Sequence, residues 1–121
     1  MPSRKLVSQL MAEILSVVAH PHRFSLIEEL ATGEKDVDQI VKILKIPQPT
    51  VSQHLSALRM QRLVISRRDG RHVFYSLRTK WIAKWLLDGL KLLEEDSSLS
   101  KEILSAAKSA RKIWTERRPQ L

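Results

Sequence analysis

Apolar residues recur at every third or fourth position along the first part of the chain, which is the spacing of one face of an α-helix. This spacing predicts a first amphipathic helix over residues 6–18. A second helix is predicted to begin after His20, because Pro21 is favoured in a first turn, and to end near Ala31 with Gly33 available as its C-terminal cap. We expect these two helices to form an outer scaffold.

A pair of short helices is predicted next. Asp36 and Gln39 have the spacing of an N-cap and capping box for a third helix, and residues 45–47 then interrupt the helical pattern. A fourth helix is predicted over residues 48–60. Its inward-facing positions are the apolar residues Val51, Leu55 and Leu58. Two short helices joined by a tight turn are typical of a helix-turn-helix.

After Leu63 the pattern changes from helical to alternating. Two β-prone runs, residues 64–68 and 71–77, flank the dipeptide Asp69-Gly70. Asp-Gly between such runs predicts a hairpin whose two central turn residues both have positive φ. The predicted tip of the hairpin is basic and carries Arg67, Arg68 and Arg71.

Two further helices are predicted in the last third of the chain. Thr79 is expected to cap a fifth helix, whose apolar positions share one face from Trp81 to Leu93 with Gly89 among them. The residues 94–98 interrupt it, and a sixth helix follows.

The order of these elements predicts the fold class. It is mostly α with a small β-hairpin, a winged helix-turn-helix with the order α-α-α-α-β-β-α and an additional C-terminal helix. The length of 121 residues fits one domain. We therefore expect a single DNA-binding and dimerisation domain over residues 1–116, followed by a frayed tail over residues 117–121.

The distribution of charge indicates a nucleic-acid partner. The formal net charge is +8, and the segment from Lys45 to Lys80 holds eight basic residues against Asp69 alone, so that all other residues together contribute only +1. A localised positive field is expected of a surface that neutralises phosphates. We expect the partner to be double-stranded DNA.

Several classes of protein are disfavoured by composition. The absence of cysteine excludes disulfides, thiolate metal ligands and thiol redox switches. The N-terminal residues lack the apolar segment of a signal peptide, and no apolar run approaches the length of a membrane span, so we expect a cytoplasmic protein without a membrane partner. No phosphate-binding glycine loop or catalytic constellation is found, so we do not expect an enzyme.

The predicted fourth helix and hairpin resemble the ArsR/SmtB family of winged-helix repressors. The resemblance rests on residues 49–58, on Leu63-Val64 and on residues 68–77, which occur in the family's order and spacing, and residues 19–24 resemble its second-helix entry. It covers roughly residues 6–93. The resemblance implies a dimer held by the first and fifth helices, with two recognition helices in successive major grooves of an inverted repeat.

The resemblance also implies which residues contact DNA. By position, the family's contacts fall on Gln48, Thr50, Ser52, Gln53 and Ser56 and on the wing arginines Arg67, Arg68 and Arg71. Short hydrogen-bonding side chains suit base edges, whereas arginines beside the backbone add attraction with little sequence information. His72 is expected to be a phosphate neighbour. The residues expected in the dimer interface are Leu10, Ile14, Trp85 and Leu86.

The chain departs from the family at its sensing sites. Asp36 and Asp38 stand where many metal-responsive members have cysteines, and the fifth helix has Asp88 but no histidine. We therefore predict no metal and no cofactor. Locally, Pro47 replaces the family's frequent serine cap, and Arg62 replaces its frequent glycine.

Some alternatives stay open from sequence alone. His20 and His22 beside Asp36 and Asp38 could form a metal site, although Asp36 is explained as a cap. His54 is either a phosphate donor or a packed support for the turn. The pair Trp81 and Trp85 lines either an interface or a ligand pocket, and the cluster Lys108, Arg111 and Lys112 either contacts flanking DNA or faces solvent. A non-specific architectural or RNA-binding module is the alternative function, and the inducer is unknown.

Overall fold

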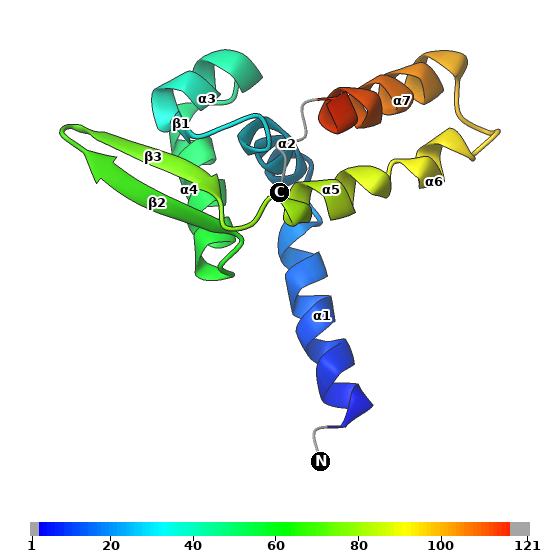
Figure 1. Cartoon of the computed structure of the whole chain (residues 1–121), viewed down its shortest axis with the longest axis horizontal. Coiled ribbons are helices and arrows are strands. Elements are labelled where there is room, and N and C mark those ends of the chain that lie inside the picture. The colour runs from blue at the N-terminus through cyan, green and yellow to red at the C-terminus, as the bar shows by residue number, and fades with distance from the viewer. Residues whose placement is uncertain (1–2, 117–121) are drawn as a thin grey trace. The chain divides into compact units, whose positions relative to one another are not determined.

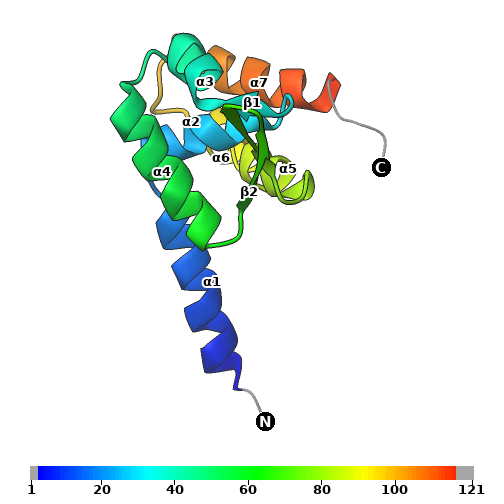
Figure 2. The ribbon, with the colours of Figure 1, turned by 90° about the vertical axis from the view of Figure 1, so that its left-hand side faces the viewer.

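The computed structural model describes residues 3–116 and the side-chain environments of residues 3–112. It is mostly helical with a small antiparallel sheet, so the predicted fold class is confirmed (Figures 1 and 2). Its contacts divide the chain into an N-terminal unit, residues 1–78, and a C-terminal unit, residues 79–121. The predicted organisation as one domain over residues 1–116 stays a prediction, and the tail predicted over residues 117–121 lies outside the described residues.

The N-terminal unit is built on four helices, and their described bounds are α1 Arg4–Val18, α2 Pro21–Leu30, α3 Val37–Leu44 and α4 Gln48–Met60. The capping box predicted for α3 is present: Asp36 Oδ1 accepts from the Gln39 N–H at 2.8 Å, and Gln39 Oε1 accepts from the Asp36 N–H at 2.9 Å. Lys45 then ends α3 in the left-handed conformation, with φ 55°. This sharp end lets the chain turn at once into α4.

The core of the N-terminal unit is aliphatic. Its fully buried side chains come from α2, α3, α4 and the first strand of the hairpin, and the largest are Leu26, Ile27, Leu30, Ile40, Val51, Leu55, Leu58 and Val64. The three inward positions predicted on α4 are therefore all in the core. A helix buried along one whole face is held firmly, so its exposed face has a defined orientation.

Helix α1 projects from the rest of the N-terminal unit, as both ribbon views show (Figures 1 and 2). Its only buried side chain is Val18 at the C-terminal end. Large apolar residues are 40–51% exposed along the rest of the helix, namely Leu6, Val7, Leu10, Met11 and Leu15. Contiguous apolar surface of this kind is typical of an interaction face.

The sheet has three strands, β1 Lys35–Asp36, β2 Val64–Asp69 and β3 His72–Leu77, in the order β1-β3-β2. The short β1 was not predicted from the sequence. The hairpin β2–β3 was predicted, but its turn differs: Asp69 pairs with His72, so the central residues are Gly70 and Arg71. Of these only Gly70 has positive φ, 63°. The prediction that both central residues have positive φ was wrong, because Gly in the first central position fits a type II′ turn.

The residue Arg62 lies in the connection between α4 and β2 and has a φ of 61°. This left-handed conformation costs a side-chain-bearing residue about 1–2 kcal/mol, which glycine avoids. The conformation explains why glycine would suit this position. The Arg62 carbonyl accepts a hydrogen bond from Arg78 Nε, which closes the base of the hairpin.

The C-terminal unit contains three helices, α5 Trp81–Asp88, α6 Lys91–Glu94 and α7 Lys101–Glu116, and α7 folds back against α5 and α6 (Figure 1). The fifth helix was predicted to run on to Leu93, which is wrong. Backbone N–H groups of Gly89 and Leu90 bond three residues back, to Leu86 and Leu87, so the backbone tightens and α5 ends.

Thr79 does not cap α5, contrary to the prediction. Lys80 occupies the N-cap position without a side-chain hydrogen bond. The Thr79 hydroxyl is buried and makes no hydrogen bond within the described part of the chain. Among the described residues, no helix is both long enough and apolar enough to cross a membrane.

Candidate nucleic-acid interface

Helix α4 has one apolar face and one polar face. The side chains of Val51, Leu55 and Leu58 are 0% exposed. On the other side lie the predicted DNA contacts: Gln48, Gln53 and Ser56 are exposed, and Thr50 and Ser52 are half-buried. Gln48 Nε2 donates to Ser52 Oγ at 3.0 Å, so two of these side chains are already ordered by one another. The exposed face offers neutral donors and acceptors, the groups that read base edges.

The start of α4 is set by proline residues rather than by a polar cap. Pro47 is the N-cap residue and makes no side-chain cap hydrogen bond, and Pro49 stands in the first turn. The Pro47 carbonyl accepts from the Val51 N–H at 3.0 Å. The helix therefore begins at Gln48 as predicted, although the serine cap frequent in the family is missing.

The hairpin β2–β3 carries the predicted wing residues. Arg68, Arg71 and His72 are all exposed around the turn. His72 Nδ1 lies 3.4 Å from Asp36 Oδ2, which links the tip to the residue that caps α3. Two arginines and a histidine at the end of an exposed ribbon can approach a phosphate backbone.

Arg67 differs from the other wing arginines because its guanidinium is already paired. Its Nε and Nη2 atoms donate to the two carboxylate oxygens of Glu34 at 2.7 and 2.6 Å, and the guanidinium lies 4.7 Å from the centre of the Phe74 ring. The hydrogen bonds from Arg67 lower the pKa of the Glu34 carboxyl. Glu34 was not singled out from the sequence, because the pair joins residues 33 positions apart.

His54 projects from α4 into the protein. It is 7% exposed, and its Nδ1 accepts a hydrogen bond from Arg23 Nε at 3.0 Å. Burial, and then the nearby charges of His20, Arg23 and His22, lower the pKa of His54. The structure therefore favours a packed support over a phosphate donor.

Two of the residues considered for a metal site, Asp36 and His20, hold the starts of helices. Asp36 caps α3, and the His20 ring accepts from the His22 N–H at 3.1 Å. On α5, Lys84 Nζ lies 2.7 Å from Asp88 Oδ2, and this hydrogen bond lowers the pKa of Asp88. Within the described residues, no group of three or more His, Asp or Glu side chains is arranged to hold a metal ion.

The predicted dimer residues belong to both units, Leu10 and Ile14 to the N-terminal unit and Trp85 and Leu86 to the C-terminal unit. Leu10 on α1 is 51% exposed and Trp85 on α5 is 40% exposed, whereas Ile14 and Leu86 are half-buried. Trp81 is 58% exposed. Apolar side chains exposed to this extent remain available for a partner surface.

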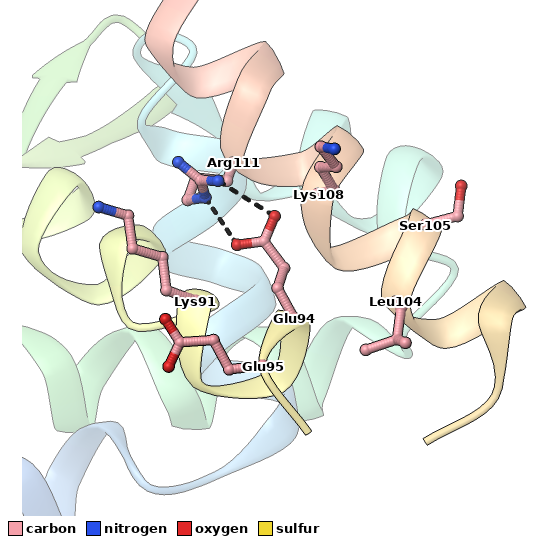
Figure 3. A pocket seen from close by; sticks show the side chains of 7 residues that line it. All are labelled: Lys91, Glu94, Glu95, Leu104, Ser105, Lys108 and Arg111. Atoms are coloured by element: carbon pink, nitrogen blue, oxygen red, sulfur yellow. Dashed lines mark hydrogen bonds and ion pairs between the residues drawn. The ribbon is translucent and has the colours of Figure 1, made fainter. Parts of the chain in front are cut away.

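A cavity of about 690 Å³ opens between α6 and α7 in the C-terminal unit (Figure 3). Its lining mixes both signs of charge and consists of Lys91, Glu94, Glu95, Leu104, Ser105, Lys108 and Arg111. Figure 3 shows Arg111 and Glu94 directed toward one another, and Arg111 Nε and Nη2 donate to the Glu94 carboxylate at 2.9 and 3.1 Å. This ion pair ties α7 to α6, so Arg111 contributes to the packing of the unit.

Comparison with known proteins identifies the family. Residues 20–66 match the family described as "Bacterial regulatory protein, arsR family". The HTH-type transcriptional repressor SmtB of Mycobacterium tuberculosis is 33% identical over 96 residues, which are 79% of this chain and 70% of that repressor. The chain belongs to the arsR family of bacterial regulatory proteins.

Two further regulators extend the similarity. The HTH-type transcriptional regulator KmtR of Mycobacterium tuberculosis is 36% identical over 81 residues, which are 67% of this chain and 62% of that regulator. The crystal structure of the transcriptional repressor PagR of Bacillus anthracis has a TM-score of 0.60 at 36% identity, covering 69% of this chain and 99% of PagR.

Membership of the arsR family fixes the class of function. The chain is a DNA-binding transcriptional regulator of the winged helix-turn-helix type, and it is not an enzyme. Regulators of this family bind double-stranded DNA operators as homodimers. The predicted family and regulatory function are thus confirmed, while the individual contact residues remain predictions.

Proposed function

We propose that this chain represses transcription as a homodimer that binds an inverted-repeat operator, with α4 as the recognition helix and β2–β3 as the wing. The observation that carries this proposal is the division of α4 into an aliphatic side, Val51, Leu55 and Leu58, buried in the core, and an exposed side that carries the neutral hydrogen-bonding residues Gln48, Gln53 and Ser56. Relatives named as repressors, SmtB and PagR, support repression as the outcome of binding. A regulator of transcription acts where the chromosome is, which supports a cytoplasmic location.

Within α4, we assign base recognition to Gln53 and Ser56, because both are exposed on the face opposite the core. A glutamine amide can donate and accept at once, so it can bond both hydrogen-bonding groups of an adenine edge. Gln48, Thr50 and Ser52 lie nearer the start of the helix and are assigned to the adjoining phosphates and base edges.

Within the wing, we assign phosphate contact to Arg68, Arg71 and His72, which are exposed around the turn. Arg67 is assigned a structural role instead. Its bidentate pair with Glu34 holds β2 to the segment before β1, and most of its charge is already balanced. Arg67 therefore sets the angle of the wing and adds less to the attraction for DNA than its two neighbours.

The homodimer is assigned to α1 and α5. Val18 is the one buried residue of α1, and the large apolar residues from Leu6 to Leu15 are mostly exposed, so burying this stripe against a second copy removes it from water. Leu10 and Ile14 on α1, with Trp85 and Leu86 on α5, are the proposed interface residues.

A binding assay tests this proposal. Fluorescence anisotropy compares a duplex carrying an inverted repeat from the protein's own promoter with a scrambled duplex and with single-stranded RNA of equal length. We expect operator affinity at least about 10³-fold above the scrambled duplex, as specific regulators show. Equal affinity for all three nucleic acids would instead support a non-specific or RNA-binding module.

A further inference from the structure

Three histidine rings and one guanidinium gather between α2 and α4 in the N-terminal unit. The ring centres of His20 and His54 are 4.3 Å apart, those of His20 and His22 are 5.3 Å apart, and those of His22 and His54 are 5.6 Å apart. Arg23 donates to the ring of His54. None of these four residues is among the proposed DNA contacts, so contact with DNA does not explain the role of this cluster.

Arg23 connects three helices through one side chain. From its place on α2, Arg23 Nη1 donates to the Val17 carbonyl near the end of α1 at 3.0 Å, and Arg23 Nε donates to His54 Nδ1 on α4 at 3.0 Å. A guanidinium is planar and rigid, so two bonds from one fork fix the direction between their acceptors. The dimerisation helix and the recognition helix are therefore joined by a defined link.

This link requires neutral His54. An imidazole nitrogen that accepts a hydrogen bond carries no proton, and protonating Nδ1 would replace the acceptor with a second donor facing Arg23. The charges that act on His54 are those of His20 and His22 and of Arg23, all cationic when protonated. A proton on His54 thus meets repulsion from the groups packed against it.

The same chemistry holds the start of α2. His20 is the N-cap residue, and its Nδ1 accepts from the His22 N–H at 3.1 Å. Two neutral imidazole acceptors therefore serve adjacent structural bonds.

We propose that Arg23 and His54 are positioning residues for DNA recognition, which hold α4 at the direction relative to α1 that an inverted repeat requires. The proposal rests on the proposed function, because it matters only if α1 pairs two protomers and α4 reads the operator. Loss of the link changes the relative direction of the two recognition helices. Discrimination between operator and random DNA then falls, while attraction to phosphates remains.

The direction of the pH effect follows from the lowered pKa of His54. At pH 7.5 His54 is neutral and the link is intact. As the pH falls below the ordinary histidine pKa and through the lower folded value, His54 takes up a proton and the link is lost.

The experiment measures the ratio of operator to random-duplex affinity for the full chain between pH 7.5 and pH 5.0 at constant ionic strength. Circular dichroism and light scattering at each pH check that the dimer stays folded. For wild type we expect the ratio to fall by about tenfold or more, the change that one linked proton gives over one pH unit. A constant ratio overturns the proposal.

Two variants separate the cluster from the wing. In His54→Asn the amide oxygen lies near the position of Nδ1 and accepts from Arg23 but does not titrate, so the ratio becomes independent of pH. His72→Gln is the matched control, and it keeps the wild-type fall in the ratio. An unchanged pH profile in His54→Asn contradicts the proposal.

A third variant tests the link at neutral pH. Arg23→Lys keeps the charge, but one ammonium cannot reproduce the fork that reaches both Val17 and His54. At pH 7.5 we expect the ratio of operator to random-duplex affinity to fall about tenfold, with little change in the random-duplex affinity itself. A loss of this size corresponds to one or two hydrogen bonds made by a charged group. A wild-type ratio in this variant overturns the proposal even if His54→Asn does not fold. Absence of operator preference in wild type at pH 7.5 would instead refute the proposed function.

Discussion

The helix α4 and the hairpin β2–β3 belong to the same unit, yet they present DNA with opposite chemistry. Up to its last turn, where Arg59 lies, α4 exposes the neutral hydrogen-bonding side chains Gln48, Gln53 and Ser56 and buries its other side, whereas the hairpin tip is basic and exposed on both faces. A packed helix holds hydrogen-bonding groups in fixed directions, which base recognition needs. An exposed ribbon needs only charge near the backbone. Specificity and affinity are thus assigned to different elements.

The largest loss of operator affinity is expected from a substitution in the proposed dimer interface, because the dimer brings two recognition helices to the operator. Leu10→Glu places two carboxylates in the proposed α1 interface and removes about 1.5–3 kcal/mol of apolar burial from each protomer. We expect a monomer by light scattering and a loss of operator affinity of about 100-fold or more, with a smaller loss on random DNA.

Leu92→Glu is the matched control for this variant, because Leu92 is an apolar residue that is 76% exposed on α6 and lies outside the proposed interface. It should remain a dimer. A Leu10→Glu protein that stays dimeric with full operator affinity would show that α1 does not hold the protomers together.

The wing arginines provide a finer comparison. Arg68→Ala should lower the slope of log affinity against log salt by about 2, because each of two protomers loses one phosphate contact at about 0.9 per contact. Arg67→Ala should change it much less, since Glu34 already pairs with Arg67. Glu34→Gln should steepen the slope by freeing that guanidinium. Equal salt slopes for Arg67→Ala and Arg68→Ala would contradict the assignment of wing positioning to Arg67 and of phosphate contact to Arg68.

A stability change of smaller size is expected at the connection between α4 and the wing. Arg62→Gly relieves the left-handed conformation and should raise the free energy of unfolding by about 0.5–1 kcal/mol, after the greater flexibility of glycine in the unfolded chain is subtracted. Urea denaturation measures it. The control is Arg59→Gly on α4, which should destabilise because its backbone is helical. Destabilisation by Arg62→Gly would show that its side chain matters more than its conformation.

No effect at all is expected from metals. Asp36 serves as a helix cap and Asp88 pairs with Lys84, so zinc, cadmium and arsenite at physiological concentrations should not release the protein from its operator. Anisotropy titrations with each metal measure this, with a chelator as the control. Release at stoichiometric zinc would mean that His20 and His22 bind metal in place of their structural bonds.

Local signals in the sequence were enough to predict the recognition helix α4. Pro47 marks its start, and the apolar spacing of Val51, Leu55 and Leu58 defines its buried face. The capping box of α3 depends on residues three apart and was predicted for the same reason. These features are set by neighbours along the chain.

Features that depend on distant pairs could not be predicted in this way. The strand β1 has only two residues, too few for an alternating pattern, and exists because Lys35 pairs with Tyr75. The Glu34–Arg67 ion pair likewise joins two elements. The break after α5 was hidden because the apolar spacing continues through it, although the backbone hydrogen bonds do not.

The central claim is that α4 reads sequence while the wing supplies attraction, and one set of isotherms tests it. Operator and random-duplex affinities are measured across a range of salt concentrations for wild type, Gln53→Ala and the double variant Arg68→Ala, Arg71→Ala. Lys101→Ala on α7 controls for the loss of a positive charge outside the wing. Gln53→Ala should lose about 1–3 kcal/mol on the operator and much less on random DNA, with an unchanged salt slope. The double variant should weaken both duplexes together and flatten the slope. Altered operator preference in the double variant with an unchanged salt slope would contradict the account, because the wing would then be reading sequence.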